Sequence, residues 1–318
     1  MIGSQETCLR PEHRNQPPWR GVVRHRRWIT LVLVTAVACL TAGCNRVSDG
    51  ATGSALQLVT QGFGARTLHD GAAADGGSVL NALRATSAVE TAYGGGFVAA
   101  IDGLKSDRAG QRDWFYFVNG VIPGRGADQQ RLAAGDTVWW DYHPWSGSTD
   151  GGPVVGSWPE PFVHGYPTRP GTVSADAPLD AALRTAGATV GTQPSRWRVR
   201  VGTDAALRDK DPAWRRAMAD PAAAGLTVRI DANRIRTLGA DGATLTDVPG
   251  GRAIAAAVLT GATSEDGGVL LAVAGLDAGA ARRAAQRIAR DPAVLRGRFA
   301  VVFDGAGNPI AAGGRDRL

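Results

Sequence analysis

The segment from 113 to 145 constrains the fold of this chain more than any other. It holds four of the nine tryptophans in the chain, together with several phenylalanines and tyrosines. Two runs, Asp113–Val118 and Thr137–His143, carry nearly all of these aromatic side chains. Aromatic and β-branched residues favour a pleated, half-buried surface, so both runs are predicted strands. The first run ends in Asn119-Gly120, a dipeptide typical of a type I′ hairpin turn.

Strand alternation predicts which of these side chains share a face, because successive residues point to opposite sides of a sheet. The more apolar sets are the expected core, and they comprise Phe115, Phe117, Val138, Trp140 and Tyr142. The remaining set forms an expected outer face of Trp114, Tyr116, Trp139 and His143. Large aromatic side chains on a solvated face usually mark an interaction surface. The alternative is that a second domain packs on this face.

The first 43 residues have the organisation of an export signal. Four arginines between residues 20 and 27 stand just before the short apolar run Trp28–Leu40, which is followed by small residues and Cys44. This order predicts a secretory signal, and the run is shorter than the roughly 20 apolar residues that span a bilayer. The ending Leu-Thr-Ala-Gly-Cys resembles a bacterial lipobox, although Thr41 stands where leucine is usual and Leu40 lies one place earlier. The resemblance implies cleavage before Cys44 and its acylation; an uncleaved signal anchor is the alternative.

Charge and cysteine content change once this leader is removed. The chain has a net charge of +6, from 35 Lys and Arg against 29 Asp and Glu. Residues 1–43 contain six arginines and two glutamates, which leaves only about +2 for the remainder. The pI of 9.8 is therefore mainly a leader effect and does not favour a nucleic-acid partner. Cys8 and Cys39 leave with the leader, so no disulfide, catalytic thiol or cysteine-based metal site is expected.

An α+β fold with two domains is predicted after a polar tether, residues 44–54. The first domain, residues 55–151, has a strand–strand–helix–strand–strand–strand order, which is typical of a β-grasp domain. Its helix is expected over Val79–Ala85 with Ser78 as N-cap, and its third strand over Gly96–Ile101. A connector rich in proline and aromatic residues follows at 152–172. We expect it to line the junction between the domains, where ligand sites often lie.

The second domain, residues 173–318, alternates strands with helices, which indicates an α/β layer. A strand with alternating arginines is predicted over Arg196–Val201, and Gly251–Leu259 is expected to be helical or buried. A helix over Ala278–Arg290 follows Asp277 as its cap. Its cationic side is predicted to be a solvated face, with contact to an anion or lipid headgroup as the alternative. That side comprises Arg282, Arg283, Arg287 and Arg290.

Two short motifs carry a family resemblance. W-x-Y-x-V-N-G begins at Trp114 and G-D-x-V-W begins at Gly135, and both follow the predicted helix and third strand in order. Together these pieces, within residues 55–145, resemble the transcobalamin-like C-terminal domain family, which is related to β-grasp domains that bind soluble ligands. The resemblance covers less than a third of the chain. No family is recognised for residues 173–318.

This resemblance implies a ligand and a set of contacts. In that family the domain closes over one face of cobalamin while a helical barrel domain holds the rest. No helical barrel is predicted here, so three alternatives stay open: the domain binds weakly by itself, it pairs with a separate helical partner protein, or it binds another ligand. The matching positions imply ligand contacts at Trp114, Tyr116, Asn119, Trp139, His143 and Trp145. Asn119 serves the turn in the alternative interpretation, and His143 is either an axial cobalt ligand or a solvated histidine at a strand end.

The sequence predicts a binding protein and no enzyme. It contains no G-x-S-x-G elbow, no G-x-x-x-x-G-K-[ST] loop and no H-E-x-x-H motif. Only Asp136, Asp141 and His143 cluster in a way that acid–base chemistry would use, and Asp136 is more simply a turn residue. No catalytic residue, metal site or resident cofactor is assigned.

The leading hypothesis is a lipid-anchored protein on the extracytoplasmic face of the cell membrane. It would capture cobalamin or a related corrinoid for handover to a membrane importer. The alternative is an interaction module that docks a protein partner or an envelope polymer through its tryptophan-rich face, with no small ligand.

Overall fold

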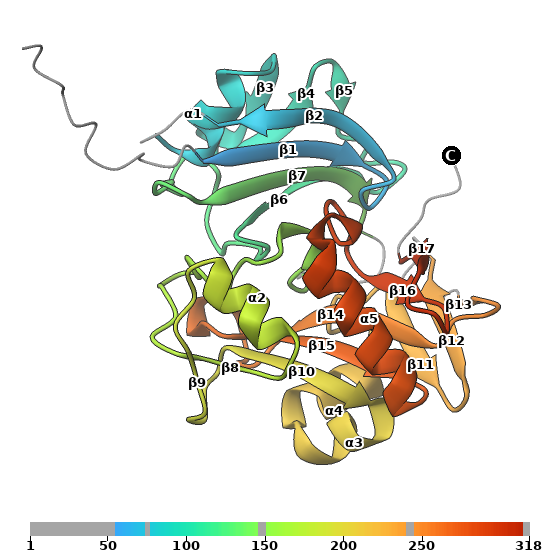
Figure 1. Cartoon of the computed structure of the whole chain (residues 1–318). Coiled ribbons are helices and arrows are strands. Elements are labelled where there is room, and N and C mark those ends of the chain that lie inside the picture. The colour runs from blue at the N-terminus through green and yellow to red at the C-terminus, as the bar shows by residue number, and fades with distance from the viewer. Residues whose placement is uncertain (1–54, 74–76, 146–150, 240–244, 314–318) are drawn as a thin grey trace, which may run out of the picture. The chain divides into compact units, whose positions relative to one another are not determined.

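The computed structural model of the chain describes residues 55–73, 77–145, 151–239 and 245–313 (Figure 1). The predicted leader, Cys44 and the tether lie outside these residues. Everything described belongs to one compact unit, residues 50–318. No helix in the described ranges has the length and apolar character needed to cross a bilayer.

A four-stranded sheet in the order β2-β1-β7-β6 forms the N-terminal lobe, residues 55–145 (Figure 1). Its strands are β1 (Leu56–Gln61), β2 (Arg66–Ala72), β6 (Arg112–Val118) and β7 (Thr137–Pro144). The central strands β1 and β7 are parallel, and each outer strand is antiparallel to its neighbour. The helix α1 (Val79–Arg84) follows the first hairpin. This order, with one helix between two hairpins, confirms the β-grasp-like prediction.

The third predicted strand lies in a separate small sheet. It is β4 (Phe97–Ile101), and it pairs with β3 (Val89–Ala92) and β5 (Leu104–Lys105). Two local predictions, the helix cap and the tight turn, are confirmed. The Ser78 hydroxyl accepts a hydrogen bond from the Asn81 N–H at 3.2 Å and caps α1 as predicted. Asn119 and Gly120 both have positive φ, 51° and 76°, which confirms the type I′ turn.

The prediction of which face of the first aromatic strand lies beside which face of the second is wrong. In the β6–β7 register Tyr116 lies opposite Trp140 and Phe117 lies opposite Trp139. Directly opposite residues share a face, so the expected core pairing of Phe115 and Phe117 with Trp140 does not occur. The alternation predicted within each strand is correct. It does not determine the pairing register between the strands, and a shift of that register by one residue moves every side chain of a strand to the other face.

Both faces of this sheet are covered, so the predicted open aromatic face is also wrong. One face packs on α1 and holds Trp114, Tyr116, Val118, Val138, Trp140 and Tyr142. The other face holds Phe115, Phe117, Trp139 and His143, and these residues meet Phe63 and Phe299. Phe299 comes from the C-terminal lobe, so packing of the second part of the chain, the alternative reading, explains why this face is aromatic.

A seven-stranded mixed sheet forms the C-terminal lobe, residues 173–313, in the order β17-β16-β14-β15-β10-β8-β9. Its strands are β8 (Val173–Ala175), β9 (Val190–Gly191), β10 (Arg198–Thr203), β14 (Ala253–Leu259), β15 (Val269–Gly275), β16 (Val301–Phe303) and β17 (Pro309–Ala312). A smaller sheet comprises β11 (Val228–Asp231), β12 (Arg234–Leu238) and β13 (Leu245–Asp247).

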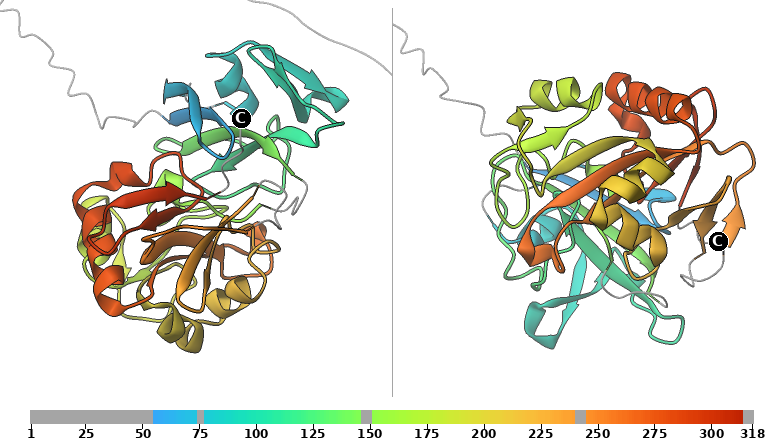
Figure 2. Two further views of the ribbon diagram at one scale, coloured as in Figure 1. Left: turned by 90° about the vertical axis from the view of Figure 1, so that its right-hand side faces the viewer. Right: turned by 90° about the horizontal axis from the view of Figure 1, so that it is seen from below.

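Helices cover both faces of the large sheet (Figures 1 and 2). The helices are α2 (Leu179–Thr185), α3 (Asp204–Lys210), α4 (Pro212–Ala219) and α5 (Ala278–Arg290). On one face of the sheet, α2 and α5 pack to form one hydrophobic core. On the other face, α4 and Leu207 of α3 pack to form a second hydrophobic core. The predicted bounds of α5 and its Asp277 cap are confirmed, with the Asp277 carboxylate accepting from the Ala280 N–H at 2.8 Å. Gly251–Leu259, expected to be helical or buried, contains the buried strand β14.

The connector, residues 152–172, is pinned between the two lobes as predicted. Val154, Val155, Phe162 and Tyr166 are all buried. The Val154 N–H donates to the Gly120 carbonyl at 2.8 Å. The connector therefore contributes to the packing of one continuous core that contains residues of both lobes.

Candidate functional site

A cavity of about 400 Å³ lies where the connector meets both lobes. The four-stranded sheet contributes the first three residues of β1 and of β7. The C-terminal lobe contributes the segment just after α5. The lining residues are Leu56, Gln57, Leu58, Gly135, Thr137, Val138, Trp139, Gly156, Ser157, Trp158, Pro159, Glu160, Pro292, Ala293 and Arg296. The cavity is therefore built from four separate segments of the chain, residues 56–58, 135–139, 156–160 and 292–296.

The walls of this interlobe cavity are mainly apolar. Leu58 pairs with Trp139 across the parallel β1–β7 ladder, and both side chains belong to the same buried cluster. Leu56 lies two residues before Leu58 on the same face, and 45% of its surface is exposed. Trp158 is half-buried and packs against Phe162 with ring centroids 5.9 Å apart. An apolar pocket with a few polar groups is the usual form of a small-molecule site.

Arg296 supplies the cationic group at this cavity. Its guanidinium forms a two-pronged ion pair with Asp70 of β2, and the Nε–Oδ2 distance is 3.1 Å. Both side chains are nearly half exposed, so the pair contributes little to stability. The pair does fix the guanidinium at the cavity wall. Because Asp70 balances its charge, the guanidinium offers a ligand N–H donors and no net positive charge.

Of the six predicted ligand contacts, only Trp139 lines this cavity. Trp114 is buried in the core of the N-terminal lobe, and its indole donates to the Leu104 carbonyl at 3.0 Å. The Tyr116 hydroxyl donates to the Arg125 carbonyl at 2.6 Å. Burial, reinforced by Tyr166, raises the pKa of the Tyr116 phenol above its usual range. These side chains are held in the protein core and do not form a surface.

Asn119 and Trp145 also lie away from the cavity. The Asn119 amide donates to the Asp136 carboxylate at 2.9 Å and to the Gly165 carbonyl at 2.8 Å, while its oxygen accepts from the Thr137 N–H at 2.9 Å. Asn119 therefore serves the turn and also fastens the connector. Trp145 is half-buried just after β7, and its backbone N–H donates to the Gln111 carbonyl at 2.9 Å.

Asp141 and His143 form a buried pair, whereas a solvated histidine was expected. The His143 Nδ1 lies 2.8 Å from the Asp141 carboxylate. The imidazole stacks on Phe63 and Phe115, at centroid distances of 4.5 Å and 4.3 Å, with Phe299 edge-on. Aromatic rings thus occupy the positions from which a ligand would approach, and we assign the pair a structural role.

Comparisons with known proteins give partial matches. Residues 76–144 match a family described as a domain of unknown function, DUF4430. A crystal structure from Ruminococcus gnavus ATCC 29149, described as that of a proposed metal-binding protein, is 18% identical. The match covers 29% of this chain and 97% of the other, with a TM-score of 0.25. No curated protein matches the chain. Among the residues that the structure describes, no group of three His, Cys, Asp or Glu side chains is arranged to hold a metal ion.

Sequence reasoning missed most of the cavity wall. The connector was expected at the junction, and Trp158 belongs to it. Leu56 and Leu58 read only as strand residues, and no local pattern distinguishes Arg296, whose partner Asp70 is 226 residues away. No single-sequence signal could have placed these side chains together.

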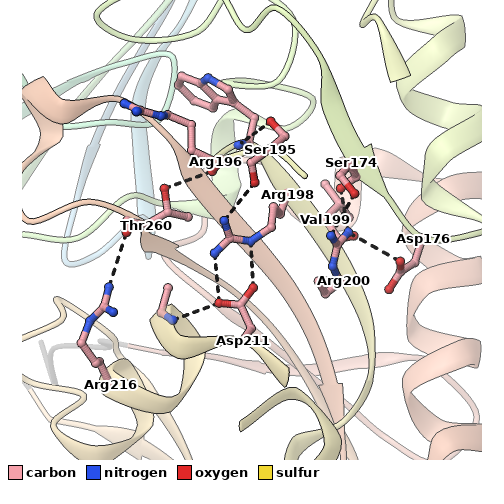
Figure 3. A network of polar contacts seen from close by, with 12 residues as sticks. Ser174, Asp176, Ser195, Arg196, Arg198, Val199, Arg200, Asp211, Arg216 and Thr260 are labelled. Atoms are coloured by element: carbon pink, nitrogen blue, oxygen red, sulfur yellow. Dashed lines mark hydrogen bonds and ion pairs between the residues drawn. The ribbon is translucent and has the colours of Figure 1, made fainter. Parts of the chain in front are cut away.

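A second cluster of polar residues lies on the C-terminal lobe (Figure 3). Arg198 of β10 forms a two-pronged bond with the buried Asp211, at 2.8 Å and 3.0 Å. Asp211 also caps α4 by accepting from the Ala213 N–H at 2.9 Å. Burial by itself would raise the pKa of Asp211, but the bond and charge of Arg198 and the helix N–H groups lower it below its usual value.

This lowered pKa predicts an acid-sensitive contribution to stability. A depressed folded-state pKa stabilises the fold above the unfolded-state value of about 4, and the effect is lost as pH falls through the folded pKa. Asp211→Asn can still cap α4, but it removes the charge, and we expect it to cost about 1–3 kcal/mol at neutral pH. Urea unfolding at neutral pH and below pH ~4 should show the difference from wild type shrinking on acidification. Asp209→Asn, at an exposed position, is the control, and an equal effect there would refute the assignment.

Proposed function

We propose that this chain is a small-ligand-binding protein of the cell envelope whose site is the interlobe cavity. The observation that carries the proposal is the apolar cavity of about 400 Å³ with Arg296 at its wall. Its lining points to a ligand with an apolar body and one polar group that accepts hydrogen bonds, such as a carboxylate, from the Arg296 N–H groups. The predicted acylation of Cys44 would hold the protein on the extracytoplasmic face of the membrane, in a position to pass its ligand to an importer.

The cavity favours a ligand smaller than a corrinoid. Drug-sized ligands occupy cavities of roughly 300–1,000 Å³, and this cavity is near the lower end of that range. The resemblance of residues 55–145 to the transcobalamin-like family supports a ligand-binding role. Capture of a corrinoid on Trp114, Tyr116 and Trp139 would require these side chains to share one open face, whereas Trp139 lies on the opposite face of the sheet from the other two and both faces are covered. Docking of a protein or polymer on that face meets the same obstacle.

The test is calorimetric titration of the purified full-length protein with octanoate, indole-3-acetate and cobinamide. We expect one of the two acids to bind with measurable heat and to raise the unfolding temperature. Trp158→Ala should weaken this binding at least about tenfold, or ~1.4 kcal/mol, because a large aromatic contact is lost. Trp145→Ala is the matched control, since Trp145 lies off the cavity wall, and it should leave the affinity unchanged.

Two outcomes would contradict the proposal. If neither acid produces heat or thermal stabilisation, the cavity is not a site for this ligand class. If cobinamide binds and Trp145→Ala weakens it while Trp158→Ala does not, the ligand sits near the end of β7 and the original corrinoid hypothesis gains support.

A further inference from the structure

The polar cluster around Arg198 lines a second cavity, of about 610 Å³. It is bounded by β10, α3 and the first residues of α4, on the sheet face opposite α2 and α5. Four cationic side chains line it, Arg198, Arg200, Lys210 and Arg216, against two carboxylates, Asp176 and Asp211. Four positive charges against two negative charges leave this basic pocket with a formal +2.

Arg200 is fixed in the pocket mainly by uncharged partners. Its Nη1 donates to the carbonyls of Ser174 and Val199 at 2.8 Å and 3.0 Å, and its Nη2 donates to the Ser174 hydroxyl at 2.9 Å. Asp176 is 3.6 Å away and 42% exposed, so solvent weakens its hold on the guanidinium. These contacts orient Arg200 without cancelling its charge (Figure 3).

Lys210 and Arg216 are exposed on the pocket lining. In the described part of the chain Lys210 has no ion pair or side-chain hydrogen bond, and Arg216 has one long bond, 3.4 Å, to the Thr260 carbonyl. Both long side chains are therefore available to an incoming anion. Arg198, by contrast, is occupied by Asp211.

We propose that this basic pocket binds a phosphate group, carried either by a soluble phosphorylated molecule or by a lipid headgroup. A phosphate monoester carries between one and two negative charges at neutral pH, which balances the formal +2, and arginine forks match its oxygens. The pocket is larger than phosphate alone requires, and Leu207, Ala206 and Val201 offer apolar contact to an organic body. It shares no lining residue with the interlobe cavity, so the proposal stands independently of the function proposed above.

The experiment titrates the full-length protein with inorganic phosphate and glycerol 3-phosphate by calorimetry, and with vesicles that contain phosphatidate, a phosphate-monoester lipid, by co-sedimentation. The test variant is Lys210→Ala with Arg216→Ala, and its unfolding temperature should match wild type because both residues are exposed. The charge-matched control is Arg282→Ala with Arg290→Ala on the exposed side of α5. We expect the test variant to weaken phosphate binding at least about tenfold and the control to change it less than about twofold.

Each outcome decides between the sources or overturns the proposal. Binding of free phosphate or glycerol 3-phosphate that is lost in the test variant identifies a soluble ligand. Vesicle binding that phosphate competes away, and that is lost in the same variant, identifies a headgroup. If neither phosphate, glycerol 3-phosphate nor vesicles bind, or if the α5 control loses as much affinity as the test variant, the pocket is not a phosphate site.

Discussion

Replacing Asp141 with alanine should lower the free energy of unfolding by about 3–5 kcal/mol, because it removes the shared acceptor of a buried hydrogen-bond network. The Asp141 side chain is fully buried in β7. It accepts hydrogen bonds from the N–H groups of Phe63 and Gly64, each at 2.9 Å. His143 Nδ1 lies 2.8 Å away, and the Thr60 hydroxyl is a further donor. Alanine would leave all four groups buried without this acceptor.

The measurement is urea unfolding of the Asp141→Ala protein beside Asp113→Ala. Asp113 lies on the same face of the sheet and is half-buried, and among the described residues its side chain has no hydrogen-bond or ion-pair partner. Its substitution should change the stability by less than ~0.5 kcal/mol. A loss of less than ~1 kcal/mol at Asp141 would show that water satisfies these donors and that the network does not hold the β1–β2 hairpin on β7.

Gly64→Ala should disrupt the contact between the lobes. Gly64 has φ +76°, and a Cβ there would lie 1.8 Å from the carbonyl oxygen of Gly297 in the C-terminal lobe. Real Cβ atoms do not approach backbone so closely, so one segment must move. We expect a loss of about 1–3 kcal/mol from this overpacking, in addition to the strain of a positive φ.

Gly103→Ala separates these two costs. Gly103 has φ +82°, and nothing lies within 4 Å of a Cβ placed there. That variant therefore carries the backbone strain alone, about 1–2 kcal/mol. Urea unfolding of both variants should show the excess at Gly64, with faster proteolysis near Gly297. Equal losses in the two variants would mean that the lobes accommodate the methyl group and that their contact is loose.

The sequence predicted local structure where a few adjacent residues decide the geometry. Ser78 and Asp277 were recognised as caps because each side chain bonds an N–H only three residues away. The Asn119-Gly120 turn followed from the positive φ that this pair tolerates. The helix α5 followed from its period and its caps.

Prediction failed where the answer depended on residues far away. β14 reads Ala-Ile-Ala-Ala-Ala-Val-Leu, and alanine does not favour strands. It is a strand because it is hydrogen-bonded between β15 and β16 and covered by helical layers on both sides. The faces of β6 and β7 were joined wrongly because large aromatic side chains occur on both faces of the two strands, so hydrophobicity by itself did not select the register.

The sequence by itself determined the tight turn, the caps of α1 and α5 and the α+β class, since these depend on side chains within a few residues. Only the tertiary structure decided which aromatic face is covered, because Phe299 reaches Trp139 across 160 residues of chain. The tertiary structure also created the two cavities. Leu56 and Arg296 line one cavity, and Arg198 and Thr260 line the other, only after the sheets have assembled. A site whose walls come from separate strands has no local signature, so packing created it.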